Sequence, residues 1–195
     1  MLSATHKLIG KSIINNIIEN FNIAVDQECF LNGCLKPDYS LPFFFIPHYK
    51  DKSFDYIIKM LEELIKHSFT SNKNIKKFYT KLGIITHFIC DYFCYAHNNK
   101  KFDNMFLHLK YEKTLHIHFE ELLNNKSYIS PSRDSRPIEV YSLNNLINYI
   151  NNMHKEYTSA PPSMEKDIYY ALEVSNYTVN FIINYINNYH KYNVA

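Results

Sequence analysis

Glycine is scarce in this chain, with only three in 195 residues, and tryptophan is absent. So few glycines argue against a glycine-rich loop that cradles phosphate, and against a sheet-rich fold with many tight turns. The net charge of +2 at pH 7 gives no electrostatic case for nucleic acid or an anionic membrane as a partner. No stretch of about 18 apolar residues occurs, so the sequence predicts no membrane-spanning helix.

The N-terminal sequence Met-Leu-Ser-Ala-Thr-His lacks the features of a secretory signal peptide. It has no basic region, no long apolar stretch and no small-residue cleavage site. We therefore expect a cytoplasmic protein, and the sequence leaves non-classical export open.

Cys90 and Cys94, two of the four cysteines, stand four residues apart and so share one face of a helix. That spacing suits a metal site or a redox pair, but it also suits two inert thiols buried in a core. We favour inert thiols here, and we expect no disulfide between Cys29 and Cys34.

Apolar residues recur with helical spacing along almost the whole chain. We expect helices over residues 5–21, 25–31, 54–67, 74–97, 102–123, 143–157 and 164–189. Residues 33–53 are expected to form a loop because Pro37, Pro42 and Pro47 forbid a continuous helix. Residues 127–137 are polar and should form an exposed loop. Without a repeat or a clear linker, the sequence predicts a single all-α, multi-helix domain over residues 1–195.

Ten histidines is a high number for this length, and five of them form an ordered series with three acids. In chain order the series is His6, Asp38, His48, His87, Asp91, His97, His108 and Glu112. Neutral imidazoles and carboxylates are ligands that zinc accepts without redox chemistry. A helix would place His87 and Asp91 about 40° apart around its axis, so they could bind one metal together. Because their helix is otherwise apolar, both side chains need partners, and the series predicts a metal centre.

The position of His97 indicates more than one metal. On a regular helix His97 would lie about 9 Å beyond Asp91 along the axis, too far for one metal to bind both together with His87. His108 and Glu112 form a second pair with a spacing of four residues, and His116 and Glu120 form another. Each such pair, taken alone, is more often a contact on a helix surface. The spacing therefore leaves open which pair completes the site.

The series resembles the bacterial zinc-dependent phospholipase C family, whose all-α domain holds three zinc ions in one cleft. The resemblance runs from Thr5 to about Glu112 and is weak beyond it. Its motifs are Thr5-His6-Lys-Leu-Ile9, Pro37-Asp38-Tyr39, Pro47-His48-Tyr49, His87-x3-Asp91-x5-His97 and His108-Leu-Lys-Tyr-Glu112. The last motif is nearly that of the family letter for letter, which favours His108 and Glu112 over the competing pair.

The resemblance implies a zinc-dependent phosphodiesterase that cleaves glycerophospholipids to diacylglycerol and a phosphorylated headgroup at a trinuclear zinc site. One zinc would be held by Asp38, His48, His87 and Asp91. A second would be held by His97, His108 and Glu112. His6 would hold the third, with Asp91 as a bridge to the first. Family members complete this site with the amine and carbonyl of an N-terminal residue, usually tryptophan, a role that would fall here to Met1.

Three further residues receive roles by this resemblance. Clustered zinc ions would neutralise a phosphodiester and lower the pKa of a bound water. Asp38 is the candidate general base that takes a proton from that water. Tyr39 and Phe45 stand where choline-preferring relatives place aromatic rings around a quaternary ammonium. Two other interpretations of the aromatic run 43–45 are packing onto the core and insertion into a lipid interface.

Two other functions fit the ligand series. One is a single-strand-specific zinc nuclease, although such enzymes usually end their ligand set with His-x3-Asp, so Glu112 favours the lipase. The other is a non-catalytic zinc-binding protein. We expect a phospholipid substrate, transient contact with a membrane surface and no nucleic-acid partner; the oligomeric state is open. The histidines outside the pattern are expected at the surface or beside the ligands: His67, His116, His118, His154 and His190.

Overall fold

The computed structural model describes residues 1–66, 72–124 and 142–193, and these residues form α-helices and two 3-10 turns without a strand. The predicted all-α fold is confirmed. The expected loop over 127–137 lies outside the described residues. The elements are α1 (Ser3–Phe21), α2 (Gln27–Tyr39), α3 (Leu41–Phe44), α4 (Lys50–Ile65), α5 (Asn72–Tyr92), η1 (Tyr95–His97), η2 (Lys100–Asp103), α6 (Met105–Asn124), α7 (Leu143–Ser159) and α8 (Met164–Asn193).

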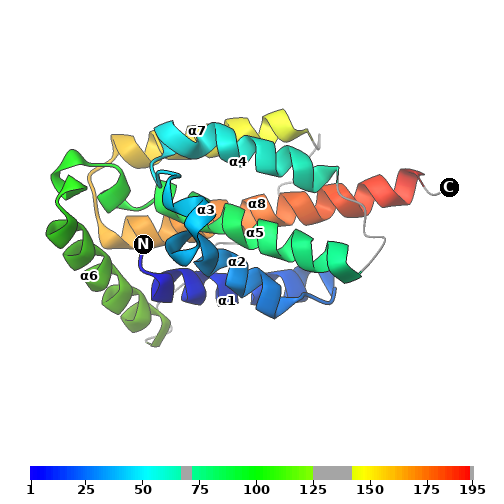
Figure 1. Ribbon diagram of the computed structural model, residues 1–195, viewed down its shortest axis with the longest axis horizontal. Helices are drawn as coiled ribbons and strands as arrows, with labels where there is room; N and C mark the ends of the chain where they lie inside the picture. The colour runs from blue at the N-terminus through cyan, green and yellow to red at the C-terminus, as the bar shows by residue number, and fades with distance from the viewer. Residues whose placement is uncertain (67–71, 125–141, 194–195) are drawn as a thin grey trace.

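Helix α8 runs through the middle of the molecule, and most of the other helices pack against it (Figure 1). It contacts α1, α4, α5, α6 and α7. Its fully buried apolar side chains include Leu172, Val179 and Phe181, which explains why so long a helix forms at the centre. Helix α6 lies at the end of the molecule near the N-terminus (Figure 1). None of the described helices combines the length and apolar character of a membrane span.

Two of the three glycines allow α2 and α5 to meet backbone to backbone. A Cβ atom on Gly33 would lie 2.3 Å from the Thr80 carbonyl oxygen, and one on Gly83 would lie 2.2 Å from that of Phe30. Any larger residue would therefore force the two helices apart. The close crossing joins the middle of α2 to the middle of α5.

The expectation of a loop over residues 33–53 is wrong, because most of this segment is helical. Pro37 lies in the last turn of α2, where it removes one backbone hydrogen bond just before the helix ends at Tyr39. Pro42 lies in the first turn of α3, where a proline removes no helical hydrogen bond. Within this segment only Ser40 and residues 45–49 are not helical, and residues 45–49 lead into α4.

Helix α5 ends at Tyr92 and does not continue to His97 as expected. The side-chain amide of Asn98 donates hydrogen bonds to the carbonyls of Tyr92, at 2.9 Å, and Cys94, at 2.8 Å. These contacts satisfy carbonyls at the end of the helix and turn the chain into η1. His97 therefore lies on the 3-10 turn η1, which folds back toward α6, and not six residues beyond Asp91 on a straight helix.

Candidate metal centre

The structure brings all nine residues predicted as metal ligands into one connected cluster. They come from the N-terminus and α1, the end of α2, the connection before α4, the end of α5, η1 and the first turns of α6. The cluster contains Met1, His6, Asp38, His48, His87, Asp91, His97, His108 and Glu112. Asp91 lies at its centre and is completely buried.

One group of ligand atoms surrounds His87. Its Nε2 atom lies 3.3 Å from His48 Nδ1, 3.2 Å from Asp91 Oδ2 and 3.6 Å from Asp38 Oδ1. Two ligand atoms at about 2.1 Å from a tetrahedral zinc are separated by roughly 3.4 Å. The distances from His87 are close to this value, and the ligand atoms of Asp38, His48 and His87 all lie within 4.8 Å of one another, so this group could hold a metal ion.

A second group surrounds Glu112. Its Oε1 atom lies 3.2 Å from His97 Nε2 and 2.9 Å from His108 Nε2. Cys94 is also close, because its sulfur, a His97 nitrogen and a Glu112 oxygen all lie within 4.8 Å of one another. The interpretation of Cys94 as an inert core thiol overlooked this position. The spacing of four residues from Cys90 predicted that both cysteines lie on one helix. In the structure Cys94 lies beyond the end of α5.

His6 provides a direct test of whether a metal fits. The ring is fully buried and stacks on the ring of His87 at a centroid distance of 3.8 Å. Neither ring nitrogen has a hydrogen-bond partner, although Nε2 lies 3.3 Å from Asp91 Oδ1. A buried imidazole without partners is costly unless another ligand satisfies it. A zinc ion beside Nε2 would do so, and the donor set suits that metal.

The ring orientation of His87 is fixed by a contact on its far side. Its Nδ1 atom donates a 2.8 Å hydrogen bond to the carbonyl oxygen of Cys34. This bond places the proton on Nδ1 and leaves the Nε2 lone pair directed at the cluster, the usual arrangement of a metal-binding histidine. The carbonyl is available at that point because the two glycines bring α2 close to α5.

The Met1 amine lies inside the cluster. It contacts Asp91 Oδ1, and it lies 2.8 Å from Glu112 Oε1 and 3.1 Å from His97 Nε2. Met1 itself is 4% exposed. The positively charged amine therefore lies between the two ligand groups and pairs with a carboxylate of each.

The charges of the cluster are strongly coupled. Burial opposes ionisation of Asp91, but the Met1 amine and the surrounding imidazoles hold its pKa well below the ordinary range. Burial lowers the pKa of His6 to about 4, and the neighbouring His87 ring acts in the same direction. At neutral pH the site thus offers anionic carboxylates and, at His6, a neutral imidazole, which are the forms that bind zinc.

A buried carboxylate on α8 supports the second group from behind. Asp167 accepts a 2.8 Å hydrogen bond from the Tyr95 backbone N–H, a 2.9 Å bond from the Tyr111 hydroxyl and a 2.7 Å bond from the Tyr157 hydroxyl. Burial raises its pKa to about 6 despite these bonds. Because Tyr95 begins η1 and Tyr111 precedes Glu112, Asp167 fixes both segments that supply the second group.

The two aromatic residues predicted to bind substrate lie outside the cluster. Tyr39 is 68% exposed and Phe45 is 84% exposed, and the Phe45 ring packs edge-on against Phe44 at 5.6 Å. Tyr49, an aromatic residue to which the sequence prediction gave no role, lies next to a predicted ligand. The Tyr49 ring packs edge-on against His97 at 5.9 Å, and its hydroxyl is 3.4 Å from Asp103. In the sequence, only the position of Tyr49 directly after His48 indicated that it lies near the site.

The remaining described histidines lie outside the cluster. His116 pairs with Glu120 at 3.6 Å and contacts the Thr5 hydroxyl at 3.1 Å, so the competing pair forms a separate contact between α6 and α1. His118 lies 3.0 Å from Glu165, and His154 lies 3.0 Å from the Asn98 amide oxygen. His67 and the side chain of His190 lie outside the described residues.

Comparison with known proteins agrees with this site. The chain matches the family described as zinc dependent phospholipase C over residues 5–192, well beyond the point at which the sequence motifs end. Searches of curated proteins and of solved structures gave no match. The match covers nearly the whole chain, and the clustered histidines and carboxylates could hold zinc ions. The chain therefore belongs to the zinc-dependent phospholipase C family and is a zinc-dependent hydrolase of phosphodiester bonds.

Proposed function

We propose that the protein hydrolyses glycerophospholipids to diacylglycerol and a phosphorylated headgroup at a site of three zinc ions. The observation that carries this proposal is the position of Asp91, whose two oxygens face different ligand residues. Oδ2 lies 2.7 Å from His48 and 3.2 Å from His87. Oδ1 lies 3.3 Å from His6 and contacts the Met1 amine. A carboxylate with ligands on both sides is suited to bridge two metal ions.

The proposed ligand sets follow these contacts. Asp38, His48, His87 and Asp91 would hold the first zinc, and His97, His108 and Glu112 the second. His6, Asp91 and the amine and carbonyl of Met1 would hold the third. Bound zinc would neutralise the phosphodiester, lower the pKa of a bound water and stabilise the leaving alkoxide.

Asp38 is the proposed general base, and its surroundings suit that role. Its side chain is 24% exposed, so water and substrate can reach it, unlike the buried Asp91. The Ser3 hydroxyl donates a 2.5 Å hydrogen bond to Oδ2. Oδ1 lies 3.6 Å from His87 Nε2 and faces the first ligand group. The hydrogen bond orients the carboxylate at the open edge of the cluster, where it can accept a proton.

Tyr39 and Phe45 are proposed to contact the headgroup of the lipid from the rim of the site. Each ring lies at one end of the short helix α3, between the base Asp38 and the ligand His48. Their exposure lets them meet a lipid that approaches this edge. A quaternary ammonium between two such rings would gain a cation–π interaction.

Metal analysis combined with two substrate assays tests the proposed activity. The purified protein should contain about three zinc ions and hydrolyse dihexanoylphosphatidylcholine, because the phosphodiester needs clustered metal ions for neutralisation. Chelation should abolish the turnover, and added zinc should restore it. Turnover of single-stranded DNA in place of the lipid would identify a nuclease. Bound zinc with neither activity would identify a non-catalytic zinc protein.

The role proposed for Met1 makes the N-terminus itself a testable ligand. A short N-terminal extension converts the amine into a peptide nitrogen, which can no longer bind zinc, and it also forces new residues into a buried position. We expect the extended protein to lose one zinc ion relative to protein whose N-terminal Met1 is verified by mass spectrometry. The same extension placed after residue 195 is the control. Equal zinc content in all three proteins would rule out Met1 as a ligand.

A further inference from the structure

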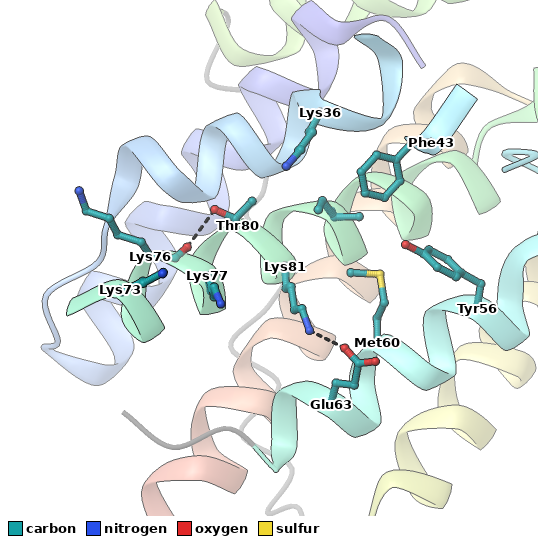
Figure 2. A pocket seen from close by; sticks show the side chains of 11 residues that line it. Lys36, Phe43, Tyr56, Met60, Glu63, Lys73, Lys76, Lys77, Thr80 and Lys81 are labelled. Atoms are coloured by element: carbon teal, nitrogen blue, oxygen red, sulfur yellow. Dashed lines mark hydrogen bonds and ion pairs between the residues drawn. The ribbon is translucent and has the colours of Figure 1, made fainter. Parts of the chain in front are cut away.

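A groove lies between α2, α4 and α5, and it contains none of the predicted metal ligands. Its volume is about 870 Å³. Five lysines line it, together with apolar side chains from α3, α4 and α5 (Figure 2). The lysines are Lys36, Lys73, Lys76, Lys77 and Lys81. No function has so far been given to this groove.

The lysines form a nearly unopposed positive charge. Four of them stand on α5 with the spacing of one helix face, and Lys36 faces them from α2. Within the part of the chain that the structure describes, Lys81 is the only one of the five paired with a carboxylate, that of Glu63. The excess charge of this one groove exceeds the net charge of +2 of the entire chain. An anionic ligand is the chemistry that fits it.

The groove is polar at one end and apolar at the other. Figure 2 shows Lys73, Lys76 and Lys77 gathered at one end, while Phe43 and Tyr56 lie at the opposite end. A small inorganic anion would use only the first end. A ligand with an anionic group attached to an apolar body would use both, which is the character of an anionic phospholipid.

The apolar end continues into the exposed segment α3. Phe43 is buried against the groove, but its neighbours Leu41, Phe44 and Phe45 are 81%, 77% and 84% exposed. Large apolar side chains exposed together are typical of a surface that meets a partner or a lipid interface. In the chain, α3 lies between the predicted ligands Asp38 and His48, and its Phe43 lines the groove, so this segment is connected to both sites.

We propose that this groove binds the headgroup of an anionic phospholipid and, together with α3, docks the protein on an anionic lipid surface. The inference rests on the proposed function, because docking matters for an enzyme whose substrate lies in a membrane. The lysines contribute charge attraction to the headgroups, and Leu41 and Phe44 enter the interface. The docked orientation presents the edge of the site with Asp38 to the membrane, so the groove supplies a second lipid contact besides the catalytic one.

Vesicle flotation with the zinc-loaded protein tests the docking. We expect binding to phosphatidylcholine vesicles that contain phosphatidylglycerol, weak binding to phosphatidylcholine alone, and a loss of binding at high salt. The triple variant K73Q/K76Q/K77Q should bind anionic vesicles on the order of 100-fold more weakly, because each lysine near an anionic surface contributes about fivefold. The variant K73R/K76R/K77R, which keeps the charge, should bind like the parent protein.

A matched control separates this groove from general surface charge. The variant K7Q/K11Q/K155Q removes three exposed lysines from α1 and α7 and should bind vesicles like the parent protein. Equal losses in both glutamine variants would overturn the proposal, as would groove-dependent binding of inorganic phosphate or single-stranded DNA without vesicle binding. Turnover of monomeric dihexanoylphosphatidylcholine should be unchanged in every variant. That assay reports on the proposed activity by itself, so failure of docking is distinguishable from failure of the catalytic proposal.

Discussion

Replacement of Asp91 by asparagine is expected to remove zinc from the protein and to lower kcat/KM by about 1,000-fold or more. The neutral amide cannot replace a carboxylate that faces His48 and His87 with one oxygen and His6 with the other. A metal ion contributes several kcal/mol of transition-state stabilisation, and about 4 kcal/mol corresponds to a factor of 10³. Metal analysis and hydrolysis of dihexanoylphosphatidylcholine measure the two effects together.

The Glu120→Gln variant is the matched control for this experiment. Glu120 also follows a histidine by four residues, but it is 53% exposed and pairs with His116 outside the cluster. It should retain full zinc content and activity. Circular dichroism verifies that the Asp91 variant is folded, since loss of a buried charged partner costs roughly 3–5 kcal/mol. A folded Asp91→Asn protein with its full zinc complement would refute the bridging role.

Asp38→Asn should nearly abolish turnover while most of the zinc remains bound. Loss of a positioned general base lowers the rate roughly 10²–10⁴-fold, and asparagine keeps the shape of the side chain without its basic oxygen. His48, His87 and Asp91 remain to hold the first zinc. The expected result is therefore a low kcat at nearly unchanged metal content, in contrast to the Asp91 variant.

Two further variants define how Asp38 works. Ser3→Ala removes the hydroxyl that orients the carboxylate and should give a smaller decrease in kcat than Asp38→Asn. Asp51→Asn changes a carboxylate on α4 that is 71% exposed and should have no effect. Substantial turnover by Asp38→Asn would exclude the residue as the base and direct attention to other groups at the site.

The candidate site could be predicted from the sequence because its metal ligands can be identified from residue types and from short spacings along the chain. The pair His87 and Asp91 needed only the geometry of one helix, and both side chains meet in the cluster. The choice of His108 and Glu112 over His116 and Glu120 needed the family motif, because the spacing is the same in both pairs. The structure separates the two pairs by their surroundings.

The parts that could not be predicted depend on contacts between distant segments. Helix α2 continues through Pro37 because its packing against α5 at Gly33 stabilises the helix more than one missing hydrogen bond destabilises it. Helix α5 stops at Tyr92, where the Asn98 side chain bonds the last carbonyl of the helix. Neither reason is visible in local periodicity. The position of Cys94 beside His97 follows from that same stop.

The net charge of the chain does not describe how charge is distributed over the folded protein. A value of +2 argued against an anionic membrane, yet the fold gathers lysines of α2 and α5 around one groove. Of the 19 acidic residues in this sum, three are predicted metal ligands, namely Asp38, Asp91 and Glu112, and only Glu63 lines the groove. Charge that is balanced along the chain is thus separated in space.

The hydrogen bonds of Asp167 have a consequence for how the site comes into being. Every predicted ligand lies within the first 112 residues, but the carboxylate that holds η1 and the first turns of α6 belongs to the last helix. The first 112 residues alone would contain every predicted ligand but would lack the hydrogen bonds to Asp167 that position η1 and α6. The second ligand group therefore has its geometry only with α8 packed in place, and zinc binding there should depend on this C-terminal helix.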